Sequence, residues 1–417
     1  MRKLFGLVAL ASMVACASTA GTTGTSSSPP ASSGPAPYTQ PVTASAAPNP
    51  TTTIAIGTTT SGASTEVTST VPPVPATIAT PSAPAMLPPS LQVDAITLPG
   101  GRSLPVQILP DGRSIQSPPS PNHDTNPAGQ LDLYSAGSNR QQQRIVDDVK
   151  PGLPIPKCFD ADTTWLVWSG DSDQAMWMAD WTVSSFNTAT GERHQIGAAP
   201  AGPAGTAASG PFVYPRVDNG IAVWSSISVR EPYGKLLDTY MAPADGSAPM
   251  TVLEPDAVDP DIAWPYVFVR KIQDPANSTT LVIVRIDLRT GERRTLDKAA
   301  TRGQLSVTKD RLLTETGDGH LVITDFDGNV RWDIAPIAGL IPSYPVAGDR
   351  FFLWYDRVYA WIFFPDTGGL YQLGSRPDAN QVMAAGPWAL WVESPDPAAT
   401  PNSDNIAFHL IKVTATA

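Results

Sequence analysis

The stretch LVIVRIDLRTGERRTL, residues 281–296, decides the fold that this sequence predicts. Its first half alternates apolar and polar residues, which places Val282, Val284 and Ile286 on one face by the two-residue period of a β-strand. Gly291 then supplies the positive φ that a tight hairpin turn requires. The stretch therefore predicts two antiparallel strands joined at this glycine.

The same turn recurs along the chain. The turn glycines are Gly191, Gly246, Gly291, Gly328 and Gly368, at steps of 55, 45, 37 and 40 residues. A blade of a β-propeller repeats at about 40–50 residues. Ahead of each turn lies a short strand and then an apolar strand ending in an aromatic residue, as in WLVW at 165–168 and FFLW at 351–354. Six such front halves but five complete hairpins predict an all-β fold, a six-bladed β-propeller with seven blades as the alternative.

The last blade is incomplete in this reading. After Trp391 the chain supplies one more strand, 407–413, whereas the region 91–150 holds short strands without a partner. A propeller leaves no open edge strand. We therefore expect a strand from 91–116 or from 131–149 to complete the last blade and close the ring of residues 151–417. Trp168, Trp224 and Trp354 stand at equivalent positions of the repeat. We therefore expect them in the core between blades.

The N-terminus predicts export. A basic start and an apolar run of about a dozen residues are typical of a secretory signal, since a membrane span needs about 20. MVAC at 13–16 resembles a bacterial lipobox, which predicts a signal peptide at 1–16 and lipid attachment at Cys16; the alternative is ordinary signal cleavage and secretion. Residues 17–90 are rich in Thr, Ser, Ala and Pro, which predicts a disordered linker.

The overall composition limits the classes of partner that the protein could bind. A net charge of −11 and a pI near 4.8 argue against nucleic acid, which binds to clustered basic surface. The chain has two cysteines, so with Cys16 lipidated Cys158 has no partner and is expected as a buried strand residue.

The pattern apolar-x-Asp-Leu-x-Thr-Gly-Glu, written as IDLRTGE at 286–292 behind an apolar strand, resembles the TolB-like six-bladed propellers. The resemblance concerns the pattern of the repeats, not any one protein, and covers about residues 158–413. It implies a bacterial envelope protein. Propellers of these families serve as protein-binding platforms, as glycan binders and in some cases as enzymes, so the fold alone does not choose among these functions.

Motifs for catalysis are absent from the sequence. The four histidines do not stand at metal-ligand spacing, and there is no Gly-x-Ser-x-Gly elbow. Carboxylate clusters occur at 160/162, 171/173 and 256/259/261. Paired acids perform glycoside hydrolysis, but aspartates that cap turns are far commoner. We expect no cofactor and no metal, and a non-enzymatic protein, with an envelope glycan hydrolase or lyase as the alternative.

The working surface is predicted from topology. The turns at Gly191, Gly291 and Gly368 join outer strands on one face, so the longer connections after the second strands and between blades lie on the other, as functional loops do on a rigid scaffold. The expected ligand-binding residues of that face are Asp171, Asp173, Arg230, Glu231, Lys271, Asp274, Asp356, Arg357 and Glu393. The sequence thus predicts a monomeric, lipid-anchored propeller on the outer face of a bacterial cell membrane, a binding or scaffold protein for an envelope protein or glycan.

Overall fold

The computed structural model describes 76–79, 85–88, 91–99, 104–117, 131–136, 141–146, 155–171, 181–200, 213–228, 237–274, 277–296, 305–336, 342–356, 359–374, 382–393 and 407–413. These residues belong to one compact unit within Pro73–Ala417. The predicted signal peptide, Cys16 and residues 118–130 lie outside the described residues.

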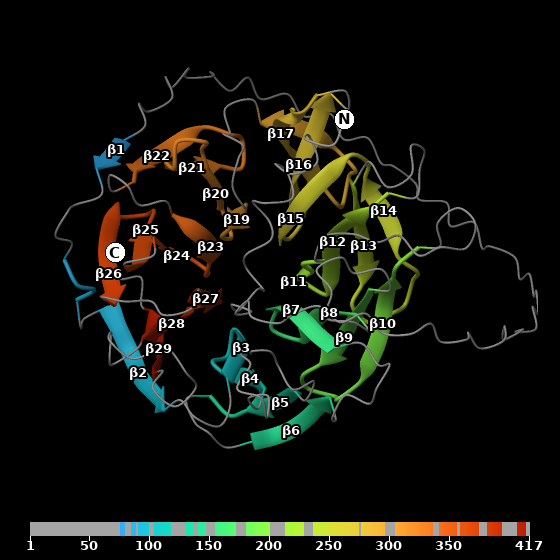
Figure 1. The fold of residues 1–417 in the computed structure, drawn as a ribbon, viewed down its shortest axis with the longest axis horizontal. Coiled ribbons are helices and arrows are strands. Elements are labelled where there is room, and N and C mark those ends of the chain that lie inside the picture. Colours follow the sequence, from blue (N-terminus) through green and yellow to red (C-terminus); the bar gives the residue numbers. More distant parts are fainter. Residues whose placement is uncertain are drawn as a thin grey trace, which may run out of the picture. The chain divides into compact units, whose positions relative to one another are not determined.

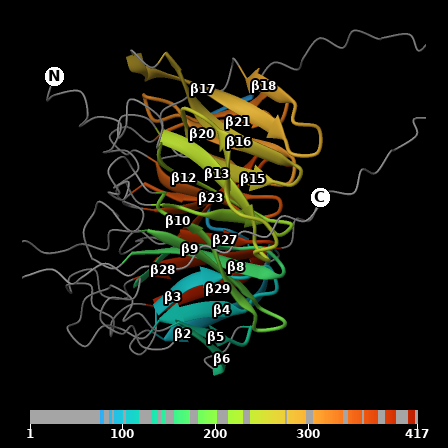
Figure 2. The same cartoon turned by 90° about the vertical axis from the view of Figure 1, so that its right-hand side faces the viewer.

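The described residues form seven β-sheets, which Figure 1 shows as a ring of blades. Apart from two N-terminal strands that lie outermost in their sheets, the strands of each sheet follow one another in chain order from the inside of the ring to the outside. The innermost strands of successive sheets contact one another. Seen from the side in Figure 2, the strands run between the two faces of the ring. The fold is therefore the all-β propeller that the sequence predicts.

The first four sheets are complete antiparallel blades of four strands. Their strands are β3 (Leu104–Ile108), β4 (Ser114–Ser117), β5 (Leu131–Tyr134) and β6 (Gln141–Val146); β7 (Ile155–Ala161), β8 (Trp165–Asp171), β9 (Thr182–Asn187) and β10 (Arg193–Ala198); β11 (Arg216–Asp218), β12 (Ile221–Ile227), β13 (Leu237–Pro243) and β14 (Thr251–Glu254); β15 (Ala257–Ala263), β16 (Tyr266–Asp274), β17 (Asn277–Asp287) and β18 (Arg293–Leu296).

Two of the remaining three blades carry an N-terminal strand at their outer edge. They are β19 (Ser306–Val307), β20 (Arg311–Glu315), β21 (Leu321–Asp325) and β22 (Val330–Ala335), with β1 (Ala76–Ala79) outside β22; β23 (Ser343–Ala347), β24 (Phe352–Tyr355), β25 (Ala360–Phe364) and β26 (Gly369–Gly374); and β27 (Val382–Ala385), β28 (Trp388–Glu393) and β29 (Ala407–Val413), with β2 (Gln92–Pro99) outside β29.

The ring has seven blades, so the alternative count is confirmed and the count of six is wrong. The strands β3 to β6 make a complete blade upstream of the predicted start at residue 151. Ring closure by an N-terminal strand is confirmed, and the strand is β2, from the 91–116 alternative. It pairs antiparallel with β29 over Gln92↔Val413 to Pro99↔Ala407. In Figure 1 the blue β2 lies beside the red C-terminal strands.

The repeated turns have the backbone that their glycines predict. Gly191, Gly291 and Gly368 have φ values of +80°, +74° and +72°. The amide of Gly291 donates to the carbonyl of Asp287 at 2.7 Å, and Gly191 repeats this bond with Asn187 at 2.9 Å. Each of these turns joins the third and fourth strands of its blade, as the repeat predicts.

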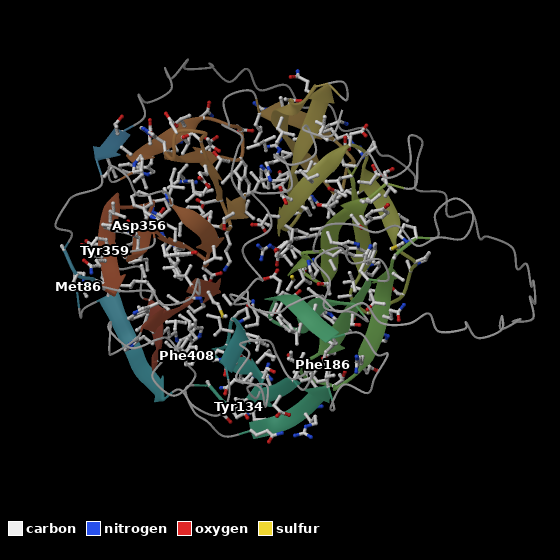
Figure 3. The ribbon with its side chains drawn as sticks, viewed as in Figure 1. Met86, Tyr134, Phe186, Asp356, Tyr359 and Phe408 are labelled. Carbon is white, nitrogen blue, oxygen red and sulfur yellow. The ribbon has the colours of Figure 1, made fainter. Side chains whose placement is uncertain are left out.

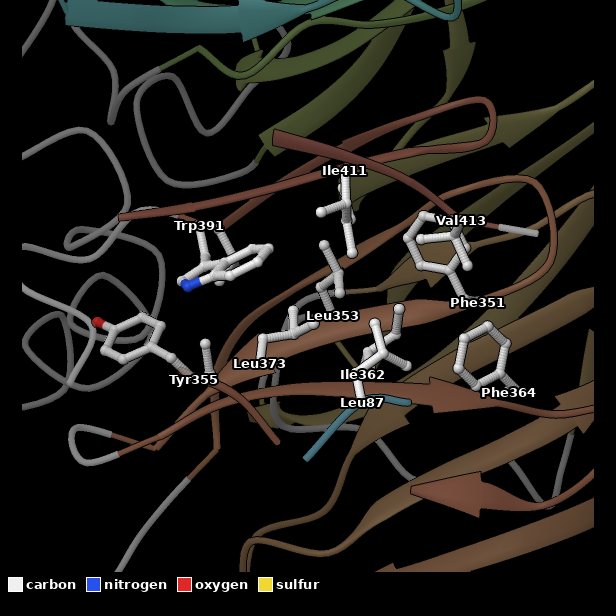
Figure 4. Close-up of a cluster of buried hydrophobic side chains, with 13 residues drawn as sticks. Leu87, Phe351, Leu353, Tyr355, Ile362, Phe364, Leu373, Trp391, Ile411 and Val413 are labelled. Atoms are coloured by element: carbon white, nitrogen blue, oxygen red, sulfur yellow. The ribbon is translucent and has the colours of Figure 1, made fainter. Parts of the chain in front are cut away.

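The hydrophobic core consists of side chains clamped between neighbouring blades. Trp168, Trp224 and Trp354 are at most 2% exposed, which confirms them as core residues. Figure 4 shows one such cluster, in which Phe351 and Ile362 of the sixth blade meet residues of the seventh. Because large apolar side chains fill each gap between sheets, the ring is a rigid scaffold.

The described residues 76–79, 85–88 and 91–99 lie along the outer edges of the last three blades, and we call them the belt. β1 pairs with β22, Met86 bridges to Gln372 of β26, and β2 pairs with β29. The predicted linker to residue 90 is therefore too long at its C-terminal end, because Leu87 is buried and 76–79 form a strand. The four residues of β1, Ala-Thr-Ile-Ala, were too few for the sequence to predict a strand there.

Candidate binding face

The two faces of the ring differ in what their backbone groups do. On one face the first–second and third–fourth strand turns meet: the amides of Thr188, Ala244 and Leu288 donate to the carbonyls of Thr164, Gly220 and Pro265 at 2.8–2.9 Å. We call this the turn face. The second and fourth strands of the blades end on the opposite face, and we call that the loop face.

The turn face is used for contacts between blades. The carboxylate of Asp162 accepts from the amide of Gly220 in the next blade at 2.8 Å, and Asp218 accepts from Trp264 in the blade after that at 2.7 Å. Burial raises the pKa of Asp218, against the hydrogen bond from Trp264. Arg113 of the first blade donates to the Thr188 hydroxyl of the second at 3.0 Å. These carboxylates therefore have structural partners.

A second set of contacts lies deeper, along the innermost strands. Asp160 accepts from the amide of Val217 at 2.8 Å, and Asp261 accepts from Val307 at 2.9 Å. An innermost strand has amides that its own sheet leaves unpaired, and buried amides need acceptors. Each of these aspartates supplies one to the next blade, which accounts for two members of the acidic clusters seen in the sequence.

A charged triad results at the inside of three consecutive blades. Burial raises the pKa of Asp160 to about 7 and also raises that of Asp261, and in both cases the Arg216 guanidinium opposes the shift. Asp160, Arg216 and Asp261 stand on β7, β11 and β15. The triad joins blades through charge as well as hydrogen bonds.

The loop face carries the ends of the strands that the sequence singles out. Asp171, Asp274 and Glu393 are the last residues of β8, β16 and β28. These are second strands, so their ends share one face, as predicted. Asp173, Arg230, Glu231 and Arg357 lie outside the described residues.

Two other predicted binding residues have partners within the protein. Lys271 forms an ion pair with the buried Glu254 of the preceding blade, whose other oxygen accepts from Arg293 Nε at 2.7 Å. The carboxylate of Asp356 is buried and accepts from the amide of Tyr359 and from Trp361 Nε1, both at 2.8 Å. Figure 3 shows Asp356 and Tyr359 side by side. A structural role accounts for both contacts, and ligand binding by these residues stays a prediction.

One cluster near the loop face escaped the sequence reading. Arg270 of β16 is 5% exposed and forms an ion pair with Asp259 of β15. Burial lowers the pKa of Arg270 to about 10, and burial raises the pKa of Glu315, the last residue of β20, to about 7 against the attraction of Arg270. A charged residue inside the apolar run YVFVRKI at 266–272 was the signal that could have revealed it.

The described part of the chain shows no group of three or more His, Cys, Asp or Glu side chains arranged to hold a metal ion. Cys158 is buried, as expected, and forms no disulfide within the described residues. His194 lies against Trp165 and His409 against Trp391, with ring centroids 5.9 and 4.9 Å apart. In the described residues there is no helix long and apolar enough to cross a membrane.

Comparison with known proteins places the fold. No model of a protein family matches the sequence, and no curated protein matches it. Among solved structures, an acylaminoacyl peptidase complex is similar with a TM-score of 0.50 and 8% identity, over 72% of this chain and 50% of that one. TolB from Acinetobacter baumannii gives 0.35 and 14%, over 56% and 53%, and BamB from Moraxella catarrhalis gives 0.40 and 12%, over 77% and 99%. This chain spans about half the length of the first two, and the likeness concerns the fold alone: the protein is a seven-bladed β-propeller.

Proposed function

We propose that the protein is a binding platform of the bacterial envelope that uses its loop face to hold an envelope protein or glycan. The observation that carries this proposal is that the polar groups of the two faces have different partners. The polar groups of the turn face bond to neighbouring blades, as Asp162 and Asp218 do. The loop face gathers the ends of the second and fourth strands, on a scaffold that burial and hydrogen bonds make rigid.

Charge reversal on the two faces tests this proposal. A partner is first identified by crosslinking in cells and mass spectrometry, and its affinity for the purified protein is then measured. Asp171→Lys with Asp173→Lys is expected to weaken binding at least about tenfold, since like charges oppose each other across an interface. The matched control is Glu192→Lys with Glu292→Lys on the turn face, which should leave the affinity unchanged. Equal effects of the two pairs would sink the assignment of the face.

The proposed location of the protein in the cell rests on its N-terminal sequence. We propose that Cys16 carries a lipid anchor and that the residues after it form the tether. Two hydrophobic chains give stable membrane attachment, whereas one gives only marginal binding. The Cys16→Ser protein should therefore lose lipid labelling and leave the membrane fraction. A mature N-terminus downstream of residue 16, without lipid, would instead favour secretion.

An envelope glycan hydrolase is the second candidate, and the Glu315 cluster favours it. A general acid at neutral pH needs a raised pKa, and that of Glu315 is about 7. Asp259 supplies a second carboxylate beside Arg270. Release of reducing ends from purified cell-wall glycan, abolished by Glu315→Gln, would support hydrolysis. No release by the unaltered protein would leave the binding platform as the function.

A further inference from the structure

The outer edge of the fifth blade holds one strand more than its own four. β1 lies outside β22 and runs parallel to it, with Ala76 opposite Trp332 and Ala79 opposite Ala335. Figure 1 shows this blue strand against the orange blade. β22 therefore has an outer edge that accepts an extended segment, and the chain itself demonstrates the direction and register of the pairing.

The side chains of β1 contribute little to this pairing. Ala76 and Thr77 are exposed. Ile78 is partly buried and packs against the apolar cluster that contains Ile334, Trp361 and Phe363. Recognition at this edge thus consists of a backbone ladder and one apolar side chain, which is the chemistry of strand addition to a sheet. Many extended segments with one aliphatic residue meet it.

The rest of the belt is held independently of β1. Leu87 is 3% exposed within the cluster of Figure 4, and its amide donates to the carbonyl of Gln372 at 3.0 Å. The amide of Gln372 donates in turn to Ala85 at 2.9 Å, and the eight residues of β2 follow. Release of β1 would therefore leave the ring closed.

The sequence of β22 also differs from those of two other outer strands. The outer strands β6 and β18 present exposed polar and basic residues, QQQR at 141–144 and RRT at 293–295. Charged edge residues oppose pairing with other chains. β22 has one arginine and one aspartate: Arg331 forms an ion pair with Asp325, and Asp333 contacts His320 Nδ1, both at 2.7 Å. The arginines of β6 and β18 are ion-paired as well, so the difference lies in the run of exposed polar residues, which β22 lacks. Only β1 covers this edge among the described residues.

We propose that the outer edge of β22 is a strand-accepting site and that β1 is its exchangeable occupant. The partner is an extended protein segment that runs parallel to β22 and places one aliphatic side chain where Ile78 lies. The site is separate from the loop face, so it adds a second binding surface at the perimeter of the propeller. β1 keeps the edge covered until such a segment displaces it.

The test compares full-length variants that differ only in β1. The tripeptide Thr-Ile-Ala of 77–79 occurs also at 53–55. The same two substitutions are therefore made at 53–54 in both proteins, so that this second copy cannot take the place of β1. The background protein carries Thr53→Pro and Ile54→Asp, and the release variant adds Thr77→Pro and Ile78→Asp. Proline removes an amide from the ladder, and aspartate is costly at an apolar contact. A melting temperature only slightly below that of the background protein would verify that the ring stays closed.

The probe is a fluorescent peptide of residues 74–81, and binding is followed by anisotropy. We expect the release variant to bind it at least about tenfold more tightly than the background protein does, and to ignore the same peptide with Thr77→Pro. Equal affinities of the release variant for the two peptides would overturn the proposal. Hydrogen exchange of the unaltered protein gives a second reading: the amides of 76–79 should exchange at least about a hundredfold faster than those of β2, and equal protection would refute exchangeability.

Discussion

At the scale of single residues, two turn glycines separate backbone strain from crowding. Gly291 and Gly368 have nearly the same φ, +74° and +72°. A Cβ at Gly291 would meet nothing within 4 Å, whereas at Gly368 it would lie 2.5 Å from the ring of Trp332. That ring is fixed by its Nε1, which donates to the carbonyl of Pro365 at 2.9 Å.

Gly291→Ala should therefore cost about 1–2 kcal/mol, the price of a left-handed conformation with a side chain. Gly368→Ala should cost at least about 1 kcal/mol more, because the indole must move as well. Urea unfolding of the two variants measures both losses. Equal losses would mean that the Trp332 contact yields freely.

Asp160 makes a prediction about pH. Its pKa in the folded protein is about 7, against about 3.9 in an unfolded chain. Between these values the folded state binds the proton that the unfolded state has lost, so this group stabilises the protein below about pH 4 and its contribution is lost as pH rises through 7. The span of about three units corresponds to up to about 4 kcal/mol.

Asp160→Asn removes the titration but keeps an acceptor for Val217. The free energy of unfolding of the original protein, minus that of the variant, should fall from pH 5 to about pH 7 and level off above it. This difference isolates Asp160 from carboxylates such as Asp287, whose pKa the side-chain hydrogen bond from Arg289 lowers and which act in the opposite direction. A difference that does not change with pH would contradict the assignment.

At the scale of elements, the sequence predicted those strands and turns whose signals lie within a few neighbouring residues. A hairpin needs its glycine and its alternating strands within about a dozen residues, so the turns at Gly191, Gly291 and Gly368 were predictable. The first blade was missed because β4, Ser-Ile-Gln-Ser, has neither an apolar run nor a terminal aromatic, and β6 begins with four polar residues. The sequence predicted short strands within 91–150 but not a complete blade.

Contacts between blades were beyond the sequence. Asp160 and Asp261 stood in acidic clusters that resemble turn caps, and only the ring brings them to the amides of Val217 and Val307, 57 and 46 residues away. The pairing of Arg270 with Asp259 and its influence on Glu315 arise in the same way. The predicted loop-face positions followed from strand direction alone, which is why their placement was predictable and their partners were not.

At the scale of the whole molecule, closure joins the two ends of the chain. β29 near the C-terminus and β2 near the N-terminus share one sheet, so the last blade is complete only when residues 92–99 are present. Without β2 the edge of β29 is open. An open edge strand invites pairing with other chains.

Three nested deletions, all keeping residues 1–16, resolve what the N-terminal region contributes to this closure. Removal of 17–75 leaves every described strand in place, so the melting temperature should not change. Removal of 17–84 takes away only β1 and should lower it slightly, because Leu87 and β2 remain. Removal of 17–103 should lower it by more than about 5 °C and promote self-association, since burial of Leu87 and the pairing of β2 with β29 are both lost. Calorimetry and light scattering measure the two effects. If the shortest and longest deletions melt together, β2 does not close the ring.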